Sequence, residues 1–328
     1  MRKRKVAALL CACLTITMAA CGGQPAPDSS ADGPRIAISM ASRDQFLSTA
    51  ENAAVARANM QGASCTVWDA TNDYAVQIQH VKNAVAEKYD AIIINEVNPG
   101  VTETLLRQAG DTPVVFLNRR PELDGLTAGK QVYVGSDDNE PGRYQAEWIN
   151  TYAQEQGLKT VRMVYFTGSE GQVATMEREQ ALIENLTVPY EMVYHSTAMY
   201  DRAKAMNQMQ RLLQSDKEFD LVVAQNDEMA LGAVQAMLLT GEKRVLCPVL
   251  GVDGTRAGCQ AILDGQMQFT VYQPGPEQGA AAVDAALALI HDSDLSEVEG
   301  ATLSEDGISL TIPYQPVDAE NAQSFLDR

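Results

Sequence analysis

Basic charge is scarce in this sequence. Lysine and arginine together number 25 against 43 aspartates and glutamates in 328 residues, so the formal net charge is −18 at pH 7. A surface that binds nucleic acid needs the opposite sign, because it must neutralise phosphates. We therefore expect no nucleic-acid partner.

Histidine and cysteine are also rare. The chain has three histidines, His80, His195 and His291, and they fall in predicted helices or strands where a packed or solvated role is expected. None of the six cysteines forms a C-x-x-C motif or lies beside a histidine at the spacing of metal ligands. We predict no metal site, no cofactor and no enzymatic activity.

Long apolar runs are confined to the first residues. Residues 1–5 read MRKRK, and residues 6–20 follow as an apolar run too short to span a bilayer stably. The run ends in Met18, Ala19, Ala20 and Cys21, which resembles a bacterial lipobox whose cysteine accepts the lipid. We predict a signal peptide over 1–20 and lipidation of Cys21; the alternative is an ordinary signal peptide with an incidental cysteine.

The segment after Cys21 has almost no apolar residues. Residues 21–33 are rich in glycine, proline, serine and aspartate, so they are predicted to be a flexible tether that holds the protein to the cell membrane through the lipid. Four basic and no acidic residues leave with the signal peptide, which takes the net charge from −18 to −22. Of the remaining cysteines, Cys65, Cys247 and Cys259 are small apolar fillers or include one disulfide, and the sequence leaves the pairing open.

From residue 35 onward, short β-branched runs alternate with amphipathic segments of helical length. The predicted strands are 35–40, 65–69, 91–95, 114–118, 132–135, 162–167, 192–197, 221–224, 249–252, 269–272 and 308–312. The predicted helices are 46–60, 74–87, 102–108, 142–156, 175–186, 202–214, 228–239 and 277–291, with Asp201 and Asp227 as N-caps of two of them. This alternation is typical of βαβ units with parallel sheets buried on both faces.

One sheet of this size would be unusual, so the pattern predicts an α/β fold with two Rossmann-like lobes. We assign residues 34–115 and 274–297 to the N-terminal lobe, and 116–273 and 298–328 to the C-terminal lobe. The chain is expected to cross between them near 114–118 and near 273–276, where Pro274-Gly275-Pro276 gives a sharp turn. These crossings would form a hinge.

Polar and aromatic side chains follow many of the predicted strands. Ligands of open α/β sheets bind beyond the carboxyl ends of the strands. The residues there are Asp44, Phe46, Asn95, Asn118, Arg119, Arg120, Gln172, Arg178, Tyr200, Asn226, Asp253 and Gln273. Carboxylates, amides and a guanidinium bind hydroxyls, and aromatic faces pack on the C–H faces of a sugar ring. The set favours a polyol site, although an Asp or Asn after a strand also commonly caps the next helix.

The chain resembles the bacterial galactose/glucose-binding and ribose-binding proteins, which are type I periplasmic binding proteins. The segments that carry the likeness read DATND (69–73), AIIIN (91–95), PVVFLN (113–118), YVGSD (133–137), TAMYD (197–201), NDEMALGAV (226–234) and GVD (251–253). The resemblance covers nearly all of the chain from Arg35 onward.

The resemblance implies a role for each residue that matches the family's ligand positions. It implies ring-hydroxyl contacts from Asp44, Asn95, Asn226 and Asp253, stacking by Phe46 and Tyr200, a guanidinium at the anomeric region from Arg178, and contacts from Gln172 and Gln273. Gln172 and Ala174 replace a His and an Asp of the galactose/glucose branch, which puts galactose or glucose specificity in doubt. The acidic calcium loop of that branch is absent at residues 157–160 (GLKT), so no structural calcium is expected.

The resemblance therefore implies an extracytoplasmic, lipid-anchored solute-binding protein of a sugar ABC transporter. Closure of the hinge would capture a small sugar-like ligand, the closed shape would be recognised by the permease subunits, and the protein would act as a monomer. The alternative within the same fold is a receptor lipoprotein that reports the sugar to a sensor kinase. A glycosidase using Asp44 and Asp253 is disfavoured because no acid–base geometry follows from their positions, and a sugar-responsive repressor is disfavoured by the export signal.

Overall fold

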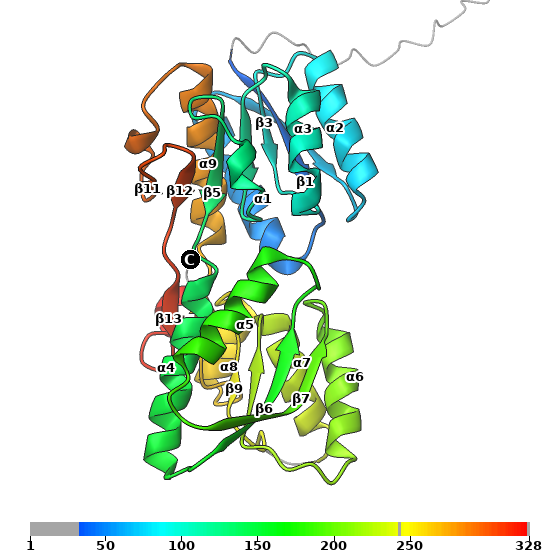
Figure 1. Cartoon of the computed structure of the whole chain (residues 1–328), viewed down its shortest axis with the longest axis vertical. Helices are drawn as coiled ribbons and strands as arrows, with labels where there is room; N and C mark the ends of the chain where they lie inside the picture. The colour runs from blue at the N-terminus through cyan, green and yellow to red at the C-terminus, as the bar shows by residue number, and fades with distance from the viewer. Residues whose placement is uncertain (1–32, 242–243, 327–328) are drawn as a thin grey trace, which may run out of the picture. The chain divides into compact units, whose positions relative to one another are not determined.

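The computed structural model describes residues 33–241 and 244–326. Within this part the chain forms an α/β structure with two principal sheets (Figure 1). The predicted signal peptide, Cys21 and nearly all of the predicted tether lie outside the described residues.

The first sheet has seven strands in the order β11-β12-β5-β4-β3-β1-β2. Its strands are β1 (Arg35–Met40), β2 (Ser64–Asp69), β3 (Ala91–Ile94), β4 (Val114–Leu117), β5 (Gln131–Gly135), β11 (Thr302–Leu303) and β12 (Ser309–Thr311). All pairings are parallel except that of β11 with β12. The helices α1 (Gln45–Met60), α2 (Tyr74–Ala86), α3 (Thr102–Ala109) and α9 (Gly275–Ile290) accompany it. We call this unit the first lobe.

Alternation along β1 explains why this sheet is covered on both faces. Ile36 and Ile38 pack in one apolar cluster with Leu47 of α1 and Ala282 of α9, whereas Ala37 packs in another. That second cluster contains helix residues from α2 and α3. Because successive side chains of a strand point to opposite faces, an uninterrupted apolar run requires cover on both sides.

The second lobe contains a four-stranded parallel sheet in the order β7-β6-β8-β9 and a two-stranded antiparallel pair, β10-β13. These strands are β6 (Val161–Thr167), β7 (Tyr190–Thr197), β8 (Leu221–Ala224), β9 (Val249–Leu250), β10 (Thr270–Tyr272) and β13 (Gln315–Val317). Its helices are α4 (Asn139–Gln156), α5 (Val173–Asn185), α6 (Arg202–Leu213), α7 (Asp227–Leu238), α8 (Arg256–Leu263) and α10 (Gln323–Leu326). Short 3-10 turns occur at η1 (Pro99–Val101), η2 (Leu123–Gly125) and η3 (Leu295–Glu297).

Three segments carry the chain between the lobes: residues 136–138 between β5 and α4, residues 273–274 between β10 and α9, and residues 312–314 between β12 and β13. A hydrogen bond joins the first and third of these segments: Ser136 Oγ donates to the carbonyl oxygen of Ile312 at 2.5 Å. We call these segments the three crossings.

The predicted division of the chain between the lobes was wrong at two places. Strand pairing puts β5, β11 and β12 in the first sheet, whereas residues 116–135 and 298–312 had been assigned to the C-terminal lobe. The crossing therefore follows β5 rather than β4. The reason is that β4 and β5 are hydrogen-bonded neighbours, with Val115 opposite Val132, a pairing that no local sequence signal reports.

The predicted N-caps were right for one helix and wrong for the other. The Asp201 side chain accepts a 2.7 Å hydrogen bond from the backbone N–H of Lys204 and caps α6. The N-cap of α7 is Asn226, which accepts from Met229 N at 2.9 Å, and Asp227 is the first helical residue. The short elements α8, β11, β13 and α10 were not predicted.

Two adjacent helices of the second lobe meet at a glycine. A Cβ atom at Gly142 of α4 would lie 2.3 Å from the carbonyl oxygen of Arg178 and 2.6 Å from the backbone nitrogen of Leu182, both on α5. No side chain fits there, so the absence of one lets α5 lie directly against α4.

Among the described residues, Cys65, Cys247 and Cys259 are free thiols. In the same part of the chain, no group of three or more His, Cys, Asp or Glu side chains is placed to hold a metal ion. No helix in residues 33–241 and 244–326 is long and apolar enough to cross a membrane.

Candidate binding site

A cavity lies between loops of the two lobes. Together with the solvent at its mouth it encloses about 840 Å³. It is lined from the first lobe by Asp44, Phe46, Val97, Pro99, Asn118, Arg119 and Arg120, and from the second by Gln172, Arg178, Tyr200, Asn226, Glu228 and Asp253, with Asp138 and Gln273 on crossings. Eight of the nine predicted ligand residues are therefore brought together.

Asn95 is the predicted residue that does not line this cavity. It is fully buried, its Oδ1 accepts from the backbone N–H of Ala41 at 3.3 Å, and its Nδ2 donates to the carbonyl oxygen of Leu117 at 3.0 Å. Both ends of the amide are used within the first lobe. In this structure Asn95 connects the ends of neighbouring strands, and a direct ligand contact from it is not supported.

Asp44 and Phe46 lie at the start of α1, directly after the first strand. Asp44 caps the helix by accepting from Leu47 N at 2.7 Å, which fixes one carboxylate oxygen. Burial raises the pKa of Asp44 above its ordinary value, against the opposing effect of this hydrogen bond and of nearby Arg119. Arg119 in turn donates to the carbonyl oxygen of Glu96 at 3.2 Å.

Asp253 presents a buried carboxylate to the cavity. Its side chain is 7% exposed, and no side chain or backbone donor among the described residues is hydrogen-bonded to it. Burial raises its pKa well above the ordinary value, and neighbouring Asp227 adds to the effect while Arg178 opposes it. Its φ of 110° is a conformation that side-chain-bearing residues rarely adopt. The second lobe thus holds a carboxyl group whose burial is unfavourable and which lines the cavity.

Asp227 lies behind Asp253 and is fully satisfied. Its carboxylate accepts from Thr270 Oγ1 at 2.6 Å, and from both the backbone nitrogen and Oγ1 of Thr255 at 2.7 and 2.8 Å. Burial nevertheless raises the pKa of Asp227 to about 6. Asp227 is a supporting group, and Asp253 is the one that faces the cavity.

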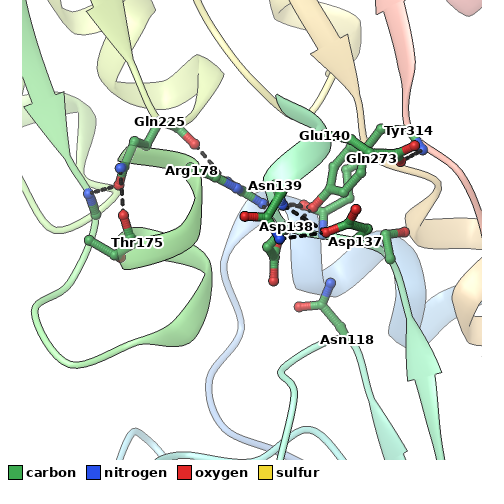
Figure 2. A network of polar contacts seen from close by, with 12 residues as sticks. Asn118, Asp137, Asp138, Asn139, Glu140, Thr175, Arg178, Gln225, Gln273 and Tyr314 are labelled. Carbon is green, nitrogen blue, oxygen red and sulfur yellow. Dashed lines mark hydrogen bonds and ion pairs between the residues drawn. The ribbon is translucent and has the colours of Figure 1, made fainter. Parts of the chain in front are cut away.

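Arg178 connects the site to all three crossings, as Figure 2 shows. One terminal nitrogen is within hydrogen-bond distance of Tyr314 Oη (2.9 Å), Asp138 Oδ1 (3.3 Å) and Gln273 Oε1 (3.3 Å), and the other donates to the carbonyl oxygen of Gln225 at 2.7 Å. Tyr314 Oη also donates to Asp138 Oδ1 at 2.9 Å. Nε of Arg178 is buried and has no hydrogen-bond partner among the described residues.

Tyr200 supplies the aromatic surface of the second lobe. Its Oη is 2.8 Å from Thr175 Oγ1, and a Cβ at Gly168 would lie 1.9 Å from its ring carbon Cζ, so the ring lies against the bare backbone there. Asn226 caps α7 with Oδ1, and its Nδ2 lies 3.4 Å from the carbonyl oxygen of Tyr200. Gln172 is the N-cap residue of α5 but makes no capping bond with its side chain.

Sequence reasoning missed several residues that line the cavity. Asp138 directly follows the turn after β5, Glu228 is in the first turn of α7, and Thr255 caps α8. Asp138 and Glu228 are near strand ends and could have been found by the same rule that found Asp253. Arg119 and Arg120 were noted after their strand but were not assigned a role.

The comparison with known proteins is decisive for the family. A model of the periplasmic binding protein domain matches residues 36–293. The chain belongs to this family. The predicted resemblance is thereby confirmed, as is the predicted fold class of a two-lobed α/β structure with mostly parallel sheets.

Individual relatives of this periplasmic binding protein agree with that assignment. A Rhizobium meliloti protein named for rhizopine binding is 30% identical over 232 residues, which is 70% of this chain and 75% of that protein. The ribose import binding protein of Bacillus subtilis is 29% identical over 248 residues, or 75% and 78% of the two chains. An ABC transporter solute binding protein from Bacillus halodurans, solved with bound myo-inositol, has a TM-score of 0.78 and 29% identity, with 91% of this chain and 99% of that chain covered.

Proposed function

We propose that this periplasmic binding protein captures a monosaccharide-like polyol between its two lobes and delivers it to an ABC permease. The observation that carries the proposal is the mixed lining of one cavity: Asp44 and Phe46 come from the first lobe, and Tyr200, Asn226 and Asp253 from the second. A ligand that meets both sets favours the closed arrangement, because only there are all of its hydroxyls bound.

The free groups of the site favour a neutral polyol. Asp253 offers acceptors without a protein donor, and Arg178 lines the same cavity with a guanidinium whose Nε has no protein partner. A hydroxyl can donate to the first and accept from the second. The relatives that are named for ribose, or solved with myo-inositol, support the same ligand class.

A thermal-shift screen of the purified protein tests this proposal. The panel contains ribose, galactose, glucose, myo-inositol, disaccharides, pentitols and nucleosides, and each hit is measured by titration calorimetry. A ligand that binds only the folded state raises the unfolding temperature by mass action. If no member shifts it and mass spectrometry finds no co-purified ligand, the polyol proposal is wrong.

We also propose that Cys21 carries a lipid that anchors the protein outside the cytoplasm. The support is the sequence of residues 18–21 and the apolar run before it. Cys21→Ser should move the protein from the membrane fraction to the soluble extracytoplasmic fraction, and it should abolish incorporation of labelled palmitate. Retention of the variant in the membrane fraction would argue for another means of attachment.

A sugar-sensing receptor is the second candidate. The same cleft would serve it, and the fold also occurs in the fructose binding periplasmic domain of a hybrid two component system, with a TM-score of 0.74 at 22% identity. Cross-linking in the native membrane separates the two roles. Recovery of a permease subunit supports transport, and recovery of a sensor kinase supports the receptor.

A further inference from the structure

One ion pair joins loops of the two lobes at the cavity, away from the crossings. Arg120 follows β4 in the first lobe, and its Nη2 is bonded to Oε1 of Glu177 on α5 in the second lobe. Among the described residues, the other ion pairs lie within one lobe or involve Asp137 or Asp138 at the first crossing. The Arg120–Glu177 pair is therefore made or broken as the lobes approach or separate.

The ion pair is partly buried, which distinguishes it from an ion pair on the open surface. The two side chains are 30% and 22% exposed, and Oε2 of Glu177 is buried without a hydrogen-bond partner. The carboxylate has thus lost water on one side and depends on Arg120 for compensation. When the lobes separate, both groups regain water, so the benefit of the pair exists only while they are together.

The pair also borders the ligand cavity. Arg120 lines the cavity, and Glu177 immediately precedes Arg178, whose guanidinium is bonded to the crossings. A ligand held by Arg178 would sit on the inner side of the pair and exclude water from it. Closure and ligand retention would then depend on the same turn of α5.

We propose that the Arg120–Glu177 ion pair is a latch across the cleft, which stabilises the closed arrangement of the lobes and slows release of the ligand. This inference rests on the hinge closure proposed above. It concerns how long the site stays closed, and it is independent of which polyol is bound.

The test uses no ligand, so that its result does not depend on the sugar proposal. Met60→Cys on α1 and Glu155→Cys on α4, both exposed, carry spin labels in a protein whose own cysteines have been replaced by serine. Distances between the labels are measured by pulsed electron resonance. Glu177→Gln and Arg120→Gln should each reduce the ratio of closed to open molecules about two- to five-fold, the range expected for a partly exposed pair.

The double variant distinguishes a latch from two unrelated effects. If the residues act through each other, Arg120→Gln combined with Glu177→Gln should be no more open than either single variant. High salt should open the wild-type protein and have little effect on the Glu177→Gln variant.

Asp284→Asn is the matched control. Arg57 and Asp284 form a bidentate pair within the first lobe, at 28% and 17% exposure, and breaking it should not change the distance between the lobes. The proposal is overturned if Glu177→Gln leaves the distance distribution unchanged, or if Asp284→Asn opens the protein as much. A failed ligand screen alongside a positive result here would refute the sugar proposal and leave the latch in place.

Discussion

At the scale of single residues, Asp253 combines a cost in stability with a proposed role in binding. Its carboxylate is buried, faces the cavity and accepts no hydrogen bond from the described residues. Burying a carboxyl group that has no hydrogen-bond partner lowers the stability of the free protein. Such a group is expected where a ligand later supplies the missing donor.

Asp253→Asn should therefore separate affinity from stability. We expect a loss of about 2–5 kcal/mol in binding free energy, since the ligand hydroxyl loses a charged acceptor. The unfolding temperature at neutral pH should rise, because an acid whose pKa is raised by folding destabilises the folded protein above its ordinary pKa, and asparagine does not titrate. Calorimetry and thermal unfolding measure the two effects. Asp264→Asn, at an exposed position, is the control, and near-normal affinity in Asp253→Asn would remove Asp253 from the site.

Glu96 is a further buried acid, and it gives the stability of the protein a defined dependence on pH. It is 1% exposed, its oxygens are 2.8 and 3.0 Å from Thr102 Oγ1, and burial raises its pKa from 4.5 to about 8. A raised pKa in the folded state means that the folded protein holds the proton more tightly. Its contribution to stability is complete below about pH 4.5 and is lost as the pH rises through about 8.

The unfolding temperature should accordingly fall between pH 5 and pH 9, and Glu96→Gln should flatten that dependence because glutamine does not ionise. Thermal unfolding across this range makes the comparison. Glu103→Gln, on the exposed side of α3, should keep the wild-type slope. Equal slopes in Glu96→Gln and wild type would mean that Glu96 is not the group that titrates.

At the scale of elements, helices α6 and α7 are both capped by a side chain that accepts a hydrogen bond from a backbone N–H, but only one of the two capping residues lines the cavity. Asp201 caps α6 outside the cavity lining, whereas Asn226 caps α7 and lines the cavity. Asp201→Ala should cost about 1 kcal/mol of unfolding free energy with unchanged ligand affinity. Asn226→Ala should cost a similar amount and also weaken binding. Urea unfolding and calorimetry compare them, and an equal effect on affinity would contradict the assignment.

Sequence reasoning succeeded where a local pattern determines an element. The bounds of β1 and β8 were predicted correctly because each is a short run made mostly of apolar residues. It failed for Asp227, which looked like a cap from its neighbours but is held by Thr255 and Thr270 from distant elements. It also failed for Asn95, whose partners Ala41 and Leu117 belong to two other segments.

At the scale of the whole molecule, Arg178 is where the lobes and the site meet. Asp138, Gln273 and Tyr314, one on each crossing, surround its guanidinium. Arg178 and Gln273 were predicted from the sequence as ligand residues, and both line the cavity. The sequence carried no signal for Tyr314, which comes together with them only when the chain has returned between the lobes for the third time.

Arg178→Met should affect the whole structure as well as the ligand. It leaves Asp138, 6% exposed, without its cation, so we expect a loss of about 3–5 kcal/mol in unfolding free energy together with loss of binding. Adding Asp138→Asn should recover part of the stability and none of the binding. Urea unfolding of the single and double variants provides the measurement; wild-type stability in Arg178→Met would refute the structural role.

The three crossings also govern the order in which the protein can fold. The first sheet is built mainly from residues 35–135, yet its strand β12 at Ser309–Thr311 pairs with β5, and helix α9 packs beside α1. Until the ribosome has made those last segments, β5 has no partner on one side and the apolar face under α1 lacks half its cover. The N-terminal half of the chain therefore cannot reach its final structure before nearly all of the chain has been synthesised.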